Sequence, residues 1–116
     1  LFACQAAYEK GEAWLNELRT YLESNFQKAK EFIQTNLPKV HLVEPQGTYL
    51  IWLDFRAYGL SDKELDDIII HKANLWLDSG HIFGPDGSGF QRINIAEPWA
   101  VLEKGLQSLA TAFKDI

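Results

Sequence analysis

The sequence predicts an α+β fold, in which a small, mostly antiparallel sheet of three or four strands carries helices packed on it. Three observations support this prediction. Apolar residues recur at helical spacing in two long segments, 14–33 and 101–113. Short runs of β-branched and aromatic residues lie between these segments and are bounded by Gly, Pro and Asn. The resulting order, a helix, two strands, a helix, two strands and a helix, is typical of helices layered on an antiparallel sheet.

The first long helix is predicted to begin near Trp14 and to end before Pro38. Its apolar positions recur every three or four residues: Trp14, Leu15, Leu18, Tyr21, Leu22, Phe26, Ala29, Phe32 and Ile33. Pro38 cannot continue a helix, because it lacks an N–H group and disfavours helical geometry in the residue before it. Gly11 predicts a break, so residues 1–10 are expected to be the tail of a separate helix.

Two strands are predicted next, at residues 40–43 and 48–55, with a turn at Pro45-Gln46-Gly47 between them. The second strand is rich in β-branched and aromatic residues and is nearly apolar on both faces. A strand of that kind is usually covered on both faces. In a chain of 116 residues, the surface of another domain is one source of the missing cover.

The second half of the chain predicts two more helices and two more strands. Ser61 and Glu64 form a capping box that begins a short helix, which ends near Lys72 with Asn74 as its stop. Residues 75–77 and 91–96 are predicted strands. Pro98 suits the first position of a last helix. The buried stripes of these two helices are predicted to be Leu65, Ile68 and Ile69, and then Val101, Leu102, Leu106, Leu109 and Phe113.

A glycine-rich segment at residues 80–89 delivers one arginine onto the 91–96 strand. Strand alternation predicts that Gln91, Ile93 and Ile95 lie on one face and that Phe90, Arg92 and Asn94 lie on the other. A guanidinium group is a rigid, permanently charged fork that binds a carboxylate or phosphate with two hydrogen bonds. Arg92 is therefore either a carboxylate ligand or an ordinary side chain on the solvated face of an antiparallel sheet.

Other chemistry-bearing residues predict no second site. The loop with Gly84, Gly87 and Gly89 opens a strand and not a helix, so these glycines are expected to supply positive φ angles or close contacts and not to hold phosphate. Asp66 and Asp67 are expected on a solvated helix face. Ser61 is accounted for by helix capping, and neither Ser61 nor Ser79 is expected to have a histidine or acid as a catalytic partner. His41, His71 and His81 lack the spacing of a metal site; His71 and His81 are expected to be surface residues, and no metal is predicted.

Composition excludes further classes of function. The net charge is −5 and no basic stripe is present, so a nucleic-acid partner is not expected. No apolar run approaches about 18 residues, so no membrane span is expected. Cys4 is the only cysteine and is expected to be a small buried residue. The absence of an internal disulfide suits a protein of the reducing cytoplasm. The chain has no methionine and begins within an apolar pattern, and it is interpreted as part of a longer protein.

Several motifs together resemble one enzyme family. They are Phe83-Gly84, Gly87, Gly89-Phe90 and Arg92-Ile93-Asn94-Ile95-Ala96, preceded by Ala7-Tyr8, Gly11, Trp14-Leu15, Tyr21-Leu22, Asn25, Gly47-Thr48-Tyr49-Leu50, Trp52-Leu53-Asp54 and Leu77-Asp78-Ser79-Gly80. Their order over nearly the whole chain resembles the C-terminal small domain of MalY/PatB-type cystathionine β-lyases, which are pyridoxal 5′-phosphate (PLP)-dependent relatives of class I/II aminotransferases. Two positions depart from the pattern: Gln46 replaces a common glutamate, and Glu97-Pro98-Trp99 replaces a usual Cys-Pro-Arg.

The resemblance implies a role for the chain within a larger enzyme. Residues 1–116 would be the small domain, and Arg92 would hold the α-carboxylate of an amino acid substrate, with Asn94 and Tyr49 as weaker candidates. PLP and its lysine would belong to the missing large domain of a homodimer, so the chain alone is expected to bind no PLP and to be inactive. A cysteine- or cystathionine-type substrate would give pyruvate, ammonia and a thiol. The alternatives are an aminotransferase and a non-catalytic module that binds small carboxylates.

Overall fold

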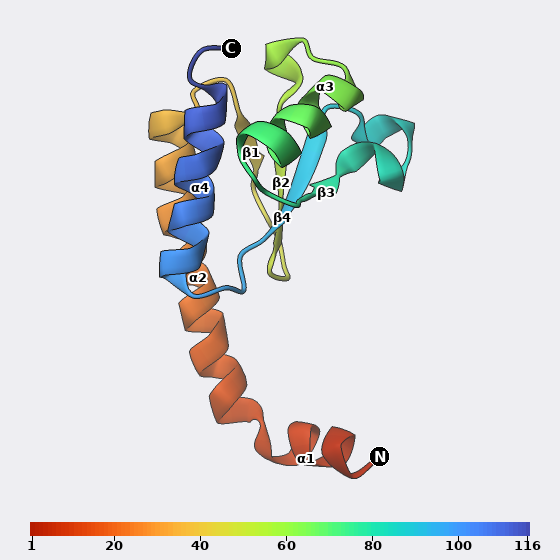
Figure 1. Ribbon diagram of the computed structural model, residues 1–116. Coiled ribbons are helices and arrows are strands. Elements are labelled where there is room, and N and C mark those ends of the chain that lie inside the picture. The colour runs from red at the N-terminus through yellow and green to blue at the C-terminus, as the bar shows by residue number, and fades with distance from the viewer.

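The computed structural model describes residues 1–116 as four helices and one four-stranded sheet (Figure 1). The helices are α1 (Phe2–Lys10), α2 (Glu12–Asn36), α3 (Asp62–Asp67) and α4 (Trp99–Phe113). The strands are β1 (His41–Val43), β2 (Leu50–Asp54), β3 (Asp78–Ser79) and β4 (Phe90–Asn94). They lie in the order β1-β2-β4-β3, and each neighbouring pair is antiparallel. The predicted fold class is confirmed.

The helices pack against one face of the sheet, here called the closed face, and leave the opposite face open. Figure 1 shows α2 and α4 side by side, with α3 in front of the strands. A single cluster of 19 buried apolar residues joins the closed face to these helices. From the sheet it takes Leu42, Ile51, Leu53 and Ile93, and from α4 it takes Leu102, Leu106, Leu109 and Phe113. The core therefore forms on one side of the sheet only.

The strand register places side chains in rows across the sheet. The closed-face row is Leu42, Leu53, Gln91 and Ser79. The open-face row beside it is Val43, Trp52, Arg92 and Asp78. Gln91 and Ile93 are buried, whereas Arg92 is half-buried and Asn94 is exposed, so the predicted alternation along β4 is confirmed.

The N-terminal part of the chain lies outside the core. The helix α2 extends beyond the sheet, and α1 sits at its far end (Figure 1). No residue of α1 is buried, and Trp14 near the start of α2 is 66% exposed. The expectation that Cys4 is buried is wrong: Cys4 is exposed, because α1 packs against no part of the core and buries none of its residues.

The predicted strands differ in detail, and β4 spans Phe90–Asn94 instead of residues 91–96, whereas the predicted end of the short helix is confirmed. The strand β2 begins at Leu50, not at Thr48, because Thr48 has a φ of 66° and belongs to the turn. Residues 75–77 are not a strand: the Leu75 N–H donates to the Ile69 carbonyl, and pairing with β4 begins only at Asp78. The helix α3 continues as a π-helical turn to Lys72, and Asn74, with a φ of 53°, provides the predicted stop.

The ends of the other elements also refine the predictions. The capping box of Ser61 and Glu64 is confirmed. Pro98 precedes α4 and does not begin it, and Val101 is 56% exposed because it lies beside the stripe that Leu102 begins. Gly89 has a φ of 78°, and a Cβ atom on Gly87 would collide with the Gly80 carbonyl, so the expected uses of these glycines are confirmed. No helix combines the length and the apolar character that crossing a membrane requires.

Candidate substrate-carboxylate site

Arg92 lies at the centre of the open-face row, between Trp52 on β2 and Asp78 on β3. Its Nε and Nη2 groups both donate to Asp78 Oδ2, at 3.1 and 2.8 Å. The Arg92 side chain is 26% exposed and the Asp78 side chain is 47% exposed. The pair is therefore held at the surface and not sealed in the core.

Aromatic rings fix the guanidinium from the side. The Arg92 Cζ atom lies 4.5 Å from the centre of the Phe83 ring, which is within the range of a cation–π contact. Trp52 packs edge-on against Phe83 with their centroids 5.4 Å apart, and also against Phe90 at 6.2 Å. Arg92, Asp78, Phe83 and Trp52 are called the Arg92 cage below.

The Arg92 cage leaves one part of the guanidinium free to bind a ligand. Asp78 uses Nε and Nη2, and the Nη1 group has no hydrogen-bond partner within the chain. Arg92 also borders a hollow beside the turn between β1 and β2, which Trp52, Leu50 and Gly47 also line. A carboxylate that enters this hollow can meet an oriented, partly desolvated cation, which is the condition for a strong charge-assisted hydrogen bond.

The two weaker candidates lie near Arg92 in sequence or on the sheet but have other contacts. Asn94 is exposed, and its Oδ1 accepts the Ala96 N–H at 2.7 Å. Tyr49 is 46% exposed and borders a different hollow, between the β1–β2 turn and α2. The structure therefore does not bring Asn94 or Tyr49 into the Arg92 cage.

Sequence analysis missed Asp78 and Phe83 as partners of Arg92. Asp78 is separated from Arg92 by 14 residues and becomes its neighbour only through the register of β3 on β4. A cross-strand pair of opposite charge is a recognisable signal once that register is known. Phe83 reaches the site from a short 3₁₀ turn at Gly80–Phe83, which no periodic pattern marks.

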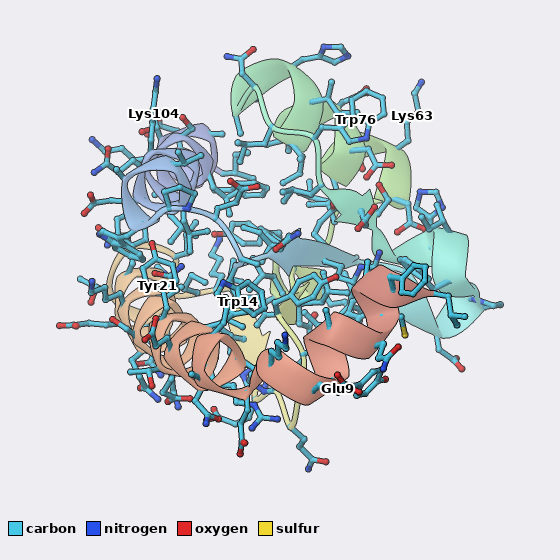
Figure 2. All side chains as sticks on the ribbon, turned by 90° about the horizontal axis from the view of Figure 1, so that it is seen from below. Glu9, Trp14, Tyr21, Lys63, Trp76 and Lys104 are labelled. Atoms are coloured by element: carbon cyan, nitrogen blue, oxygen red, sulfur yellow. The ribbon has the colours of Figure 1, made fainter.

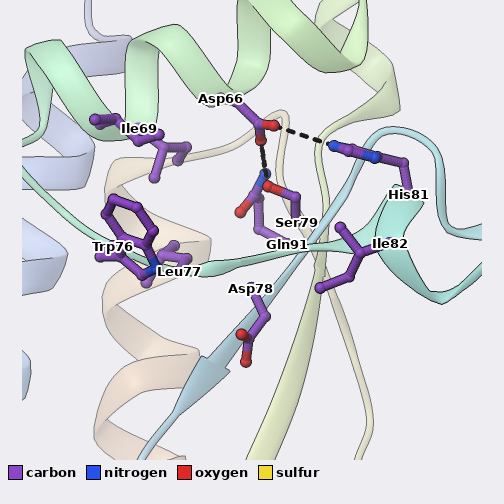
Figure 3. Close-up of a pocket in the computed structure, with 10 residues that line it drawn as sticks. Asp66, Ile69, Trp76, Leu77, Asp78, Ser79, His81, Ile82 and Gln91 are labelled. Carbon is purple, nitrogen blue, oxygen red and sulfur yellow. Dashed lines mark hydrogen bonds and ion pairs between the residues drawn. The ribbon is translucent and has the colours of Figure 1, made fainter.

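The sequence predicted that Asp66 lies on a solvated face of its helix. The structure corrects this, because Asp66 on α3 is partly buried. Its carboxylate accepts hydrogen bonds from Ser79 Oγ at 2.5 Å, Gln91 Nε2 at 2.8 Å and His81 Nε2 at 3.1 Å (Figure 3). Partial burial alone raises the pKa of Asp66, but these three hydrogen bonds outweigh that effect and hold the pKa below its usual range. Ser79 therefore does have an acid partner, which only the tertiary fold supplies.

This cluster is not a nucleophilic triad. In such a triad the histidine lies between the serine and the acid, so that it can take the hydroxyl proton. Here Asp66 lies in the middle, and Ser79 donates to the carboxylate instead of to His81. His81 is exposed, as expected, but it has Asp66 as a partner; His71 is exposed near the end of its helix.

The residues of this chain do not fit PLP as a complete binding site. A PLP enzyme needs a desolvated lysine for the Schiff base. Lys30 is half-buried and pairs with Glu44 at 2.9 Å, and the other lysines are exposed: Lys10, Lys28, Lys39, Lys63, Lys72, Lys104 and Lys114. Figure 2 shows Lys63 and Lys104 pointing away from the body of the molecule. No step on the cofactor is therefore assigned to this chain.

Several known proteins are similar in sequence to this chain. The chain is 47% identical to cystathionine beta-lyase PatB of Bacillus subtilis over 110 residues, which is 95% of the chain and 28% of PatB. It is 34% identical to the protein MalY of Escherichia coli over 111 residues, which is 96% of the chain and 28% of MalY. No family model matches the chain.

The fold of the chain is also similar to that of a solved PLP-containing protein. The crystal structure of cystalysin from Treponema denticola, which contains PLP, superposes with a TM-score of 0.93 and 38% identity over 97% of the chain and 29% of cystalysin. Over nearly its whole length the chain is similar to PLP-dependent enzymes of the MalY/PatB type, which is consistent with the C-terminal small domain of such an enzyme. The chain spans 28% of the length of the curated relatives PatB and MalY.

Proposed function

We propose that this small domain binds the substrate carboxylate in a PLP-dependent C–S β-lyase, and that Arg92 is the residue that binds it. A substrate of the cysteine or cystathionine type, with water, would give pyruvate, ammonia and a thiol. The observation that carries the proposal is the free Nη1 group of Arg92, held in a fixed place by Asp78 and Phe83 beside a hollow on the open face.

The geometry supports a positioning role for Arg92. Its guanidinium is already oriented by two hydrogen bonds and one aromatic ring, so little side-chain entropy is lost when a ligand binds. Holding one end of a substrate in a fixed place can supply several kcal/mol of the reduction in the reaction barrier. The reaction itself would take place on groups outside these 116 residues.

The proposed enzyme also contains parts outside these 116 residues. A large domain would provide PLP and its lysine, and would cover the open face and the exposed side chains of α1. Residues 1–10 would be the end of a helix from that domain. The complete enzyme would be a homodimer. The apolar side chains that the small domain leaves exposed, such as Phe2 and Trp14, support a need for such cover.

Two other functions, that of an aminotransferase and that of a carboxylate-binding module, can be distinguished from a lyase by experiment. Aminotransferases are also among the relatives, and an arginine that holds an α-carboxylate would serve them equally well. Pyruvate and ammonia formed without an added keto acid would identify a lyase, whereas a requirement for a keto acid would identify an aminotransferase. A free-standing binding module would release measurable heat when the isolated chain is titrated with amino acids; a half-site binds only feebly.

The proposal is tested by replacing Arg92 in the full-length enzyme. Arg92→Ala is expected to raise KM strongly and to lower kcat/KM by about 10²-fold or more, because a charge-assisted pair with the substrate is lost. Arg92→Lys, which keeps the charge and loses the fork, is expected to give an intermediate loss. Steady-state kinetics with a cysteine-type substrate measure both effects.

Arg56 provides a matched control. It also makes two side-chain hydrogen bonds to a carboxylate, that of Asp54, and it also lies over an aromatic ring, that of Phe90 at 4.7 Å. Its side chain is 64% exposed, compared with 26% for Arg92. Arg56→Ala is expected to leave KM unchanged. Equal kinetics for the Arg92→Ala and Arg56→Ala enzymes would overturn the proposed role of Arg92.

A further inference from the structure

The helix α3 presents two carboxylates to the segment that builds the Arg92 cage. Asp62 and Asp66 are four residues apart and so lie on the same side of the helix. Asp62 accepts the Gly89 N–H at 2.8 Å and the Ser88 hydroxyl at 3.0 Å. Asp66 accepts the three side-chain donors described above. Both carboxylates thus bind residues 79–91, which run from β3 through the glycine loop into β4.

The three donors that bind Asp66 come from the segments that carry three of the four residues of the Arg92 cage, Asp78, Phe83 and Arg92; the fourth, Trp52, lies on β2. Ser79 directly follows Asp78 on β3, and Gln91 directly precedes Arg92 on β4. His81 lies two residues before Phe83 in the turn at Gly80–Phe83. One carboxylate therefore holds together the segments that carry Asp78, Arg92 and Phe83.

The contacts of Asp66 and those of Arg92 lie on opposite faces of the sheet. Neighbouring residues of a strand point to opposite faces, so Ser79 and Gln91 point to the closed face while Asp78 and Arg92 point to the open face. Figure 3 shows Asp66 above Ser79 and Gln91, with the side chain of Asp78 directed away from them. Asp66 can therefore set the position of the backbone at the site without touching a ligand there.

The sheet at this point has few other restraints. The strand β3 has only two residues and is the edge of the sheet, so its register on β4 depends on a short ladder. Gln91 is 1% exposed, and its amide group would lose its acceptor if the Asp66 carboxylate were removed. An unpaired buried donor is costly, so the side chain and the strand would shift to find a new partner.

We propose that Asp66 is a positioning residue for Arg92: from the closed face it fixes β3, β4 and the Gly80–Phe83 turn, and so holds Asp78 and Phe83 against the guanidinium. This inference rests on the proposed function of Arg92. It assigns to α3 a part in substrate binding, although α3 supplies no residue to the open face.

The test compares Asp66→Ala with Asp67→Ala in the full-length enzyme. The two variants remove the same group from adjacent positions, but Asp67 is exposed. Asp66→Ala is expected to raise KM for the amino acid substrate about tenfold, with a smaller change in kcat, because uniform binding of the carboxylate is weakened. Asp67→Ala is expected to leave both constants unchanged.

A double-mutant cycle with Arg92→Ala gives the decisive readout. If Asp66 acts through Arg92, Asp66→Ala raises KM no further in an enzyme that already lacks Arg92. If the two changes multiply, Asp66 acts independently of Arg92, and the inference is wrong. An unchanged KM in the Asp66→Ala enzyme would also overturn it. An unchanged KM in the Arg92→Ala enzyme would instead overturn the proposed function, so the two failures are distinct.

A second variant keeps the test valid if Asp66→Ala does not fold. Asp66→Asn retains an oxygen that can accept from Ser79 and Gln91 but replaces the oxygen that accepts from His81. It is expected to raise KM about threefold, less than the alanine variant, and this rise is again expected to vanish in the Arg92→Ala background. A rise that persists there would contradict the inference.

Discussion

The two neighbouring rows of the sheet have nearly the same backbone but opposite surroundings. In the closed-face row, Leu53 and Gln91 are 0% and 1% exposed and lie under the helices. In the open-face row, Trp52 and Arg92 are half-buried, and the side chain that packs on them comes from Phe83 of the short Gly80–Phe83 turn. Both rows contain one polar side chain of β4 with an acidic partner: Gln91 binds Asp66, and Arg92 binds Asp78.

The two polar pairs differ in whether the atom that lacks a hydrogen-bond partner is buried or lies near the surface. The Gln91 amide is sealed in the interior, and its Oε1 atom has no partner and no access to solvent. Arg92 has an unpartnered Nη1 group, and its side chain borders a hollow on the surface. The polar pair of the closed row is therefore part of the packed interior, whereas the pair of the open row is the proposed ligand-binding pair, although the two rows are one residue apart.

The largest expected difference between the faces concerns apolar burial. Leu53→Ala on the closed face is expected to lower the free energy of unfolding by about 3 kcal/mol, because it leaves a cavity in the packed core. Leu50→Ala, the same substitution on the open side of β2, is expected to cost about 1 kcal/mol, because Leu50 is only partly buried. Denaturant unfolding followed by circular dichroism measures both values. Similar losses for the two variants would show that the open face of this chain is covered.

A second expected difference concerns pH and the closed face. The folded-state pKa of Asp66 lies below its usual value of 3.8, so its ionised form stabilises the fold above about pH 5. This contribution declines as the pH falls through 3.8 toward the folded-state pKa. Asp66→Asn is therefore expected to lower the midpoint of thermal unfolding most at neutral pH and least below pH 4.

Asp67→Asn controls for the change in net charge, because Asp67 is the exposed neighbour. Its unfolding midpoint is expected to follow that of the unmodified chain across the same pH series. If Asp66→Asn lowers the midpoint equally at pH 7 and at pH 3.5, the hydrogen bonds of Asp66 do not favour its ionised form, and the pH argument is wrong.

The elements that the sequence predicted well depend on local signals. The capping box of Ser61 and Glu64 needs only four residues, and the stripe from Leu102 to Phe113 needs only helical periodicity. The alternation along β4 is also local, so the side of the sheet on which Arg92 lies could be predicted. The resemblance to a known family then supplied the order of the motifs and the candidate role of Arg92.

The features that the sequence did not predict depend on distant contacts. Asp66 looked like one of two adjacent surface acids, because its donors lie 13 to 25 residues further along the chain. Residues 75–77 looked like a strand from their composition, yet the Leu75 N–H is used by the end of the preceding helix. Composition measures preference for a strand, whereas the neighbouring backbone decides whether pairing occurs.

The smallest expected effect concerns Asn94, on the same open face as Arg92. Its side chain accepts the Ala96 N–H at 2.7 Å, and such an exposed bond contributes about 0.5–1 kcal/mol to stability. Asn94→Ala is expected to lower the free energy of unfolding by about that amount and to leave KM of the full-length enzyme within about twofold. Asn94→Asp, which keeps the acceptor oxygen, is expected to restore the stability. A tenfold rise in KM for Asn94→Ala would instead make Asn94 a second ligand of the carboxylate. The hydrogen bond to Ala96 would then have to break or be shared when substrate binds, and the capacity to bind would extend along the open face of β4 beyond Arg92.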